Sequence, residues 1–330
     1  MITSPIFRYG HRDVEMPKNL KGAGLMPPMR GADSIITAPR AQHARIRKAL
    51  SYAFSEKALR EQESFLQTYV GKLIDRLHDK ASEGPQNVVD WLNWTTFDVV
   101  GDLAFGAPFG CLDDHQYHPW IKILFDGVRL IPYIQAALYF RILPLLSLIS
   151  PRAMVDAKKE ADANADAKVE ARVAHGGELD RKDFFSYILR ESNKGDDSKL
   201  SMAECKETAG ILIIAGSETT ATFLSGAFYC ILQHPRVYDR LVAEVRSHFS
   251  SADDITMVKA ASLKYLPAVV DETFRIYPPS PAAFPRVVPG KGERIEGEWV
   301  PGGTTVGVPQ YAANHNPANF GKSRYRQHRR

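Results

Sequence analysis

The chain has 330 residues, 44% of them hydrophobic and 24% charged, a composition typical of a globular protein with a substantial core. Its three cysteines exclude a disulfide framework and a paired-cysteine metal site, and they indicate an intracellular protein. The formal net charge of +4 comes from the last nine positions, because removing their five basic residues leaves −1: Lys322, Arg324, Arg326, Arg329 and Arg330. We interpret residues 321–330 as a solvated basic tail rather than a nucleic-acid-binding segment.

The first half of the chain is predicted to be mainly helical. Proline and glycine in the first 40 residues predict a loop, and apolar residues then recur at helical spacing from Gln42 to Leu77. Trp91 to Phe105 is a second helical segment with a buried pattern. Ala157 to Ala174 is rich in alanine and charge, which predicts a solvated helix.

Residues 130–151 form an apolar stretch that is long enough to cross a bilayer. Pro132 and Pro144 interrupt it, and Arg141 lies near its middle. A buried helix pair, or a surface segment that makes peripheral contact with a membrane, fits this pattern better than a true span.

The second half is predicted to begin with a long helix and to end with short strands. Ser201 and Glu204 have the spacing of a capping box, and the helical pattern continues to His234. Further helices are predicted at 236–249 and 267–277. Short runs rich in β-branched residues then predict a small sheet: 284–288, 293–300 and 304–308. The fold class is therefore mainly α, with a helical body at about 42–277 and a minor β region at about 280–310.

The segment Ala215-Gly216-Ser217-Glu218-Thr219-Thr220 lies in the middle of the long helix. A carboxylate between apolar flanks needs partners or a purpose, and nearby hydroxyls can bond to carbonyls one turn earlier. An acid–alcohol pair of this kind suits a proton relay. A helix-packing glycine beside a surface Glu-Thr-Thr explains the segment equally well.

Two further constellations have helical spacing. Glu272 and Arg275 share a helix face, so a bidentate ion pair is geometrically easy. His43 and Arg47 lie one turn apart, where they could bind a carboxylate, although a solvated basic face is at least as consistent with the spacing.

In this order and spacing, the segments resemble the cytochrome P-450 family. The matching motifs are A-G-x-E-T-T, E-x-x-R about fifty residues later, a Pro-Pro strand with an arginine, and H-x-x-x-R before an A-F-S turn. The sequence is similar to fungal microsomal members of secondary metabolism, and the resemblance covers residues 1–320. It implies a heme-thiolate monooxygenase that oxidises an apolar small molecule with electrons from an NADPH-cytochrome reductase.

The resemblance also implies roles for particular residues. Glu218 and Thr219 would be catalytic, delivering protons. The heme would be contacted by Ala215, Gly216, His43, Arg47 and Arg286. Glu272 and Arg275 would form a structural ion pair, and the substrate-facing residues would be Pro281, Ala282 and Ala283. Membrane contact through 130–151 would accompany association with the endoplasmic reticulum, with a cytoplasmic location as the alternative because we identify no N-terminal anchor within these 330 residues.

The sequence departs from the family at the heme-ligand loop. The family motif Phe-x-x-Gly-x-x-x-Cys-x-Gly is absent from the 330 residues, and none of the cysteines is expected to act as a metal ligand: Cys111, Cys205 and Cys230. We therefore expect a P-450 domain that is partial at both ends. The alternative hypothesis is a non-catalytic remnant or incomplete gene model that binds no heme.

Overall fold

The computed structural model describes residues 16–19, 32–119, 166–174, 183–192 and 199–320, with single residues and short pieces between 121 and 163. The predicted basic tail 321–330 and most of 130–151 lie outside the described residues. The large apolar side chains described in that stretch are exposed, which agrees with a surface segment: Tyr133, Phe140 and Ile142.

The described elements follow one another along the chain as helices first and short strands near the end. The helices of the first part are α1 (Arg40–Ser51), α2 (Glu56–Lys80), η2 (Ala81–Glu83), α3 (Val88–Phe105), α4 (Cys111–Asp114) and α8 (Phe184–Ser192). The helices of the second part are α9 (Met202–Leu232), α10 (Pro235–His248), η5 (Ala252–Asp254), α11 (Met257–Ser262), α12 (Tyr265–Ile276) and α13 (Gln310–His315). This order confirms the predicted mainly helical class.

The segment 42–77 forms two helices. Ser55 separates them, because its side chain accepts a hydrogen bond from the Ala58 N–H and caps the start of α2. The apolar stripe expected on α2 is buried only in part: Tyr69 is buried, whereas Val70 and Ile74 are more than half exposed. Helical spacing therefore located the helix but overestimated how much of its face is covered.

The prediction that helix 157–174 is solvated is wrong for the end of it that the structure describes. Val169 is 1% exposed and packs in the main core, and the side chain of Arg172 is 3% exposed. Arg172 is buried because Asp183 pairs with it, a contact that helical spacing cannot reveal.

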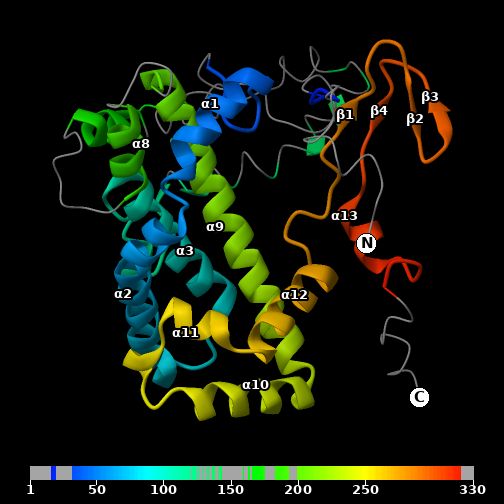
Figure 1. Ribbon diagram of the computed structural model, residues 1–330. Coiled ribbons are helices and arrows are strands. Elements are labelled where there is room, and N and C mark those ends of the chain that lie inside the picture. Colours follow the sequence, from blue (N-terminus) through cyan, green and yellow to red (C-terminus); the bar gives the residue numbers. More distant parts are fainter. Residues whose placement is uncertain are drawn as a thin grey trace.

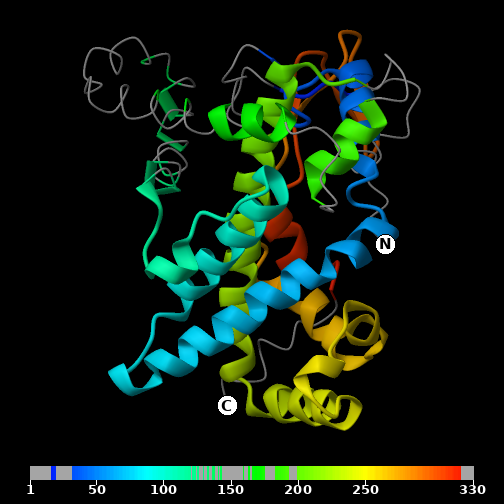
Figure 2. The same ribbon diagram turned by 90° about the vertical axis from the view of Figure 1, so that its left-hand side faces the viewer.

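Helix α9 runs lengthwise through the middle of the fold in both views (Figures 1 and 2). It packs against α3, α10 and α12. Among the described residues, α9 is the helix long and apolar enough to cross a membrane, although only 22% of its most apolar window is buried inside the structure. Its packing against three helices matches the central helix of a globular domain. Within the described part of the chain, the side of α9 that carries Ala215 is exposed, and we call it the open side.

The main core forms where α3 meets α9. The α3 side chains Phe97, Leu103 and Phe105 pack in one cluster with Ala209 and Ile213 of α9. Helix α3 is buried over most of its length, as the continuous apolar pattern of 91–105 predicted. The contact is close enough that a Cβ on Gly216 would lie 3.0 Å from a methyl group of Val100.

The minor β region consists of two antiparallel pairs at one end of the molecule (Figure 1). One pair is β1 (Arg286–Val287) with β4 (Thr305–Val306), and the other is β2 (Glu293–Ile295) with β3 (Glu298–Val300). Their strands are shorter than the predicted runs. The β2–β3 turn has positive φ at both Glu296 and Gly297, which is the backbone of a tight hairpin turn.

Candidate functional site

The polar segment of α9 bonds to its own helix. Thr219 Oγ1 donates to the Ala215 carbonyl and Ser217 Oγ donates to the Ile213 carbonyl, each one turn earlier. Such bonds compete with the helix ladder, yet α9 remains continuous across the segment. The predicted hydrogen bonds from side-chain hydroxyls to carbonyls one turn earlier are therefore present. They place the Thr219 hydroxyl near the middle of the length of α9.

Glu218 lies half-buried beside Thr219. Its Oε2 atom is shielded from solvent and has no hydrogen-bond partner in the structure. Burial raises the pKa of this carboxyl, and the positive charge of Arg129 opposes that rise only in part. A shielded, unpartnered carboxyl with a raised pKa is suited to holding and passing on a proton.

Gly216 and Ala215 face different surroundings. Gly216 faces Val100 of α3, where the absence of a side chain lets the two helices approach closely. Ala215 is exposed. The structure therefore gives Gly216 the helix-packing role, while Ala215 and Thr219, one turn apart, mark the open side of α9.

Glu272 and Arg275 form a bidentate ion pair on α12, with Nε–Oε2 and Nη2–Oε1 distances of 2.7 Å. Arg275 also donates to the Asn314 carbonyl at 2.9 Å, so it ties α12 to α13. The Arg275 side chain is 13% exposed and that of Glu272 is 59% exposed. Hydrogen bonds from Arg275 lower the pKa of Glu272, which keeps the carboxylate ionised.

Glu244 of α10 orients α12, a role that the sequence did not reveal. Its carboxylate accepts hydrogen bonds from three consecutive N–H groups at the start of α12, at 3.0, 2.8 and 2.9 Å: Lys264, Tyr265 and Leu266. These groups have no partner within their own helix, and the helix dipole favours a negative charge there. Glu244 thereby fixes the end of the helix that carries Glu272 and Arg275.

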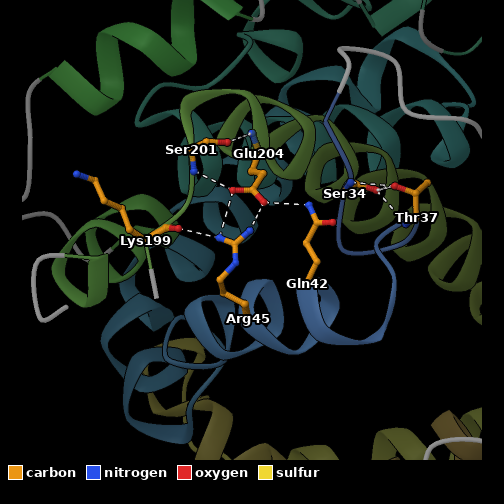
Figure 3. A network of polar contacts seen from close by, with 7 residues as sticks. All are labelled: Ser34, Thr37, Gln42, Arg45, Lys199, Ser201 and Glu204. Atoms are coloured by element: carbon orange, nitrogen blue, oxygen red, sulfur yellow. Dashed lines mark hydrogen bonds and ion pairs between the residues drawn. The ribbon is translucent and has the colours of Figure 1, made fainter. Parts of the chain in front are cut away.

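The residues expected to contact heme carboxylates come from two elements. His43 is half-buried and Arg47 exposed on α1, whereas Arg286 is half-buried on β1. The guanidinium of Arg286 donates to the Met16 carbonyl at 3.4 Å. Arg45, between His43 and Arg47, has a different partner, because it pairs with Glu204 of α9 (Figure 3).

The predicted substrate-facing residues follow α12 and precede β1. Pro281 and Ala282 are exposed, and Ala283 is half-buried. The Pro281 carbonyl accepts a hydrogen bond from the Tyr311 N–H at 3.2 Å, which holds the segment against α13. Ala283 lies against Gly307, where an added Cβ would come within 2.9 Å of the alanine methyl group.

The three cysteines lie in helical segments that do not favour a thiolate. Cys111 and Cys205 are buried in the main core, and Cys230 is half-buried near the end of α9. Burial raises the pKa of Cys111 to about 12 and that of Cys205 to about 11, and it also raises the pKa of Cys230. A thiolate is the form that ligates metal, so these side chains are packing residues.

Comparison with known proteins agrees with the motifs and the geometry. The family model described as cytochrome P-450 matches residues 15–324, which includes the first residues of the expected tail. A cytochrome P-450 monooxygenase, alt3, of Alternaria solani is 40% identical over 96% of this chain and 61% of its own length. The monooxygenase astA of Talaromyces wortmannii is 44% identical over 89% and 59%, respectively.

Another relative and a solved structure extend the comparison. The trichothecene C-15 hydroxylase of Fusarium sporotrichioides is 38% identical over 94% of this chain and 63% of its own length. The cytochrome P-450DA heme domain matches with a TM-score of 0.73 at 20% identity, covering 88% of this chain and 62% of that one. The chain thus spans about three fifths of the length of the curated relatives it matches. With a family match over most of its residues, the chain belongs to the cytochrome P-450 family.

Proposed function

We propose that this chain provides the oxygen-side and heme-carboxylate residues of a monooxygenase that oxidises an apolar small molecule in fungal secondary-metabolite biosynthesis. Relatives of 36–44% identity are fungal monooxygenases and hydroxylases, including an averantin hydroxylase and a trichothecene hydroxylase. An NADPH-cytochrome reductase would supply the electrons. Membrane contact through 130–151, and association with the endoplasmic reticulum, belong to the same proposal.

The observation that carries the proposal is the position of Glu218 on α9. The carboxyl is half-buried with a shielded, unpartnered oxygen, and Thr219 follows it on the helix. Burying such a group costs free energy, so a fold that keeps it in the middle of its central helix is expected to use it. Glu218 would hold a proton, and Thr219 would receive it on the open side of α9.

The family implies heme, and the described residues fit it on one side only. His43, Arg47 and Arg286 supply hydrogen-bond donors for its carboxylates, and the exposed Ala215 leaves a small side chain on the open side of α9. The residues do not fit the axial role, because all three cysteines lie in helices with a raised thiol pKa. We therefore assign no reaction step to heme in this chain.

Titration of the purified chain with ferric heme, followed by absorbance, tests the proposal. Saturable binding of one equivalent is expected. Arg47→Gln should weaken this binding by about tenfold or more, since a hydrogen bond to a charged group contributes about 1.5–3 kcal/mol. Arg236→Gln on the exposed α10 is the matched control and should bind like the parent chain.

Two outcomes separate the proposal from its alternative. Absence of saturable binding would favour a remnant that binds no heme. Equal weakening by both arginine variants would instead contradict the specific role of Arg47 in binding the heme carboxylates. Reduction under carbon monoxide should give no thiolate-type Soret shift, because burial disfavours all three thiolates. A clear shift would show that one of these cysteines ligates iron after all.

A further inference from the structure

The carboxylate of Glu204 joins the start of α9 to α1 (Figure 3). Its Oε2 accepts from the Ser201 N–H at 2.9 Å and from Arg45 Nη1 at 3.2 Å. Its Oε1 accepts from Gln42 Nε2 at 3.1 Å and from Arg45 Nη2. Arg45 Nη1 also donates to the Lys199 carbonyl at 2.7 Å, so one guanidinium contacts both the helix start and the loop before it.

This network does more than cap α9. Ser201 and Glu204 form a reciprocal capping box, in which glutamine can replace glutamate. The two further bonds come from α1, and the Glu204 side chain is only 7% exposed. Burial raises the pKa of Glu204, but hydrogen bonds from Arg45, the Ser201 N–H and Gln42 outweigh it and lower the pKa to about 2. The ionised carboxylate is therefore the form that binds α1.

The bonds to Glu204 fix the rotation of α1. At about 100° per residue, the face that carries Gln42 and Arg45 lies about 150° from the face that carries His43 and Arg47. Directional bonds on one face therefore set the direction of the other. The distance along the axis is fixed as well, because the bidentate guanidinium tolerates little sliding.

The rest of α1 packs against α8 and the main core through contacts that tolerate small rotations and shifts. Its buried side chains are small or aliphatic, and apolar contacts have no preferred direction: Ile46, Ala49 and Leu50. The residue before the helix, Pro39, provides no side-chain cap. Among the described contacts, the bonds from Gln42 and Arg45 to Glu204 are the ones that tie the polar face of α1 to α9.

We propose that Glu204 and Arg45 are positioning residues that hold α1 in register on α9, so that His43 and Arg47 are presented together toward the heme carboxylates. The proposal rests on the proposed function for the role of His43 and Arg47. The coupling between α1 and α9 stands on the geometry of the network alone.

A distance measurement between spin labels on the two helices tests the coupling. Lys48 of α1 and Gln233 at the end of α9 are exposed and outside the proposed site. Both are changed to cysteine, and the half-buried Cys230 is changed to serine. Cys111 and Cys205 are buried with raised thiol pKa values, so they should react slowly with the label.

Glu204→Gln is the decisive variant, because it keeps the capping box and removes the charge. A narrow distance distribution is expected for the parent chain, and a broader or shifted one for Glu204→Gln and for Arg45→Met. The double variant should be no worse than either single variant, because both remove the same interaction. An unchanged distribution in Glu204→Gln would overturn the proposal.

Asp98→Asn controls for a general loss of stability. Asp98 is fully buried on α3 and accepts the N–H groups of Cys111 and Leu112 at 3.1 and 2.8 Å, far in sequence from both labels. It should lower stability and leave the distribution narrow. If it broadens the distribution as much as Glu204→Gln does, the effect is one of stability and the positioning role is refuted.

Heme titration separates this proposal from the proposed function. If the parent chain binds heme, Glu204→Gln should weaken binding roughly two- to thirtyfold, the range for residues that act through a neighbour. Equal affinity would break the link to the heme carboxylates. If the parent chain binds no heme, the proposed function fails, and the link to the heme carboxylates fails with it. The distance measurement still decides whether Glu204 holds α1 in register.

Discussion

Replacing Arg172 by methionine is expected to destabilise the fold strongly, because it leaves a buried carboxylate without its counter-charge. The Arg172 side chain is 3% exposed and that of Asp183 is fully buried. Two hydrogen bonds of 2.8 Å join the guanidinium to the two carboxylate oxygens, and a third of 2.8 Å reaches Ser186 Oγ. Gly106, with φ of 76°, packs against this pair at the end of α3.

The expected loss of stability is large because both side chains are almost fully buried. Removing one partner of a buried ion pair costs about 3–5 kcal/mol, whereas replacing both is often nearly neutral. Asp183 also accepts the Ser186 N–H at 2.8 Å at the start of α8, and asparagine caps a helix about as well as aspartate. Arg172→Met combined with Asp183→Asn should therefore be clearly more stable than Arg172→Met alone.

Urea unfolding of the single and double variants measures the difference. Lys80→Met is the matched control, because the Lys80–Glu83 pair has the same 2.8 Å distance but side chains that are 29% and 58% exposed. An exposed pair contributes about 0–1 kcal/mol, so the control should shift the urea midpoint little. The stabilising role of the buried pair is refuted if Arg172→Met lowers the free energy of unfolding no more than Lys80→Met does. It is also refuted if the effects of the two buried substitutions are additive, because the pair then does not act as one interaction.

Three further predictions concern individual helices. Gly226→Ala should lower the thermal midpoint, because its Cβ would lie 2.2 Å from the ring of Tyr277. Gly71→Ala meets nothing within 4 Å and should instead stabilise α2 by about 0.5–1 kcal/mol. Glu218→Gln should raise the thermal midpoint at pH 7, because burial raises the pKa of Glu218 and its ionised form therefore costs stability above the unfolded pKa. The gain should vanish below about pH 4, where the carboxyl is protonated in both states. A gain that stays constant with pH would point to another cause. Glu244→Ala should accelerate hydrogen exchange at the first amides of α12, and unchanged rates would contradict its capping role.

Features set by neighbouring residues were predictable from the sequence. The Ser201–Glu204 capping box and the Glu272–Arg275 pair both form, because three residues along a helix place these side chains within reach of each other. The hydroxyl of Thr219 bonds one turn back for the same reason. The helical body and the minor β region also lie where periodicity and β-branched runs indicated.

Contacts between distant residues were not predictable in this way. Arg45 is separated from Glu204 by 159 positions in the sequence, and Arg172 is separated from Asp183 by 11. Neither pair has a local spacing signal, because each joins residues that only the packing of separate segments brings together. Gly216 had two equally good explanations, and the position of Val100 on α3 was needed to choose between them.

Two of the three glycines of α9 explain how one helix can combine packing with chemistry. Gly216 and Gly226 admit Val100 of α3 and Tyr277, the residue that follows α12, so α9 is held by close contacts at two points along its length. A site is most precise when rigid elements hold it, and Glu218 lies between these two contacts. Shielding this carboxylate costs free energy, and the packing on either side of it offsets that cost. Loosening either contact should therefore disturb Glu218 before it unfolds α9.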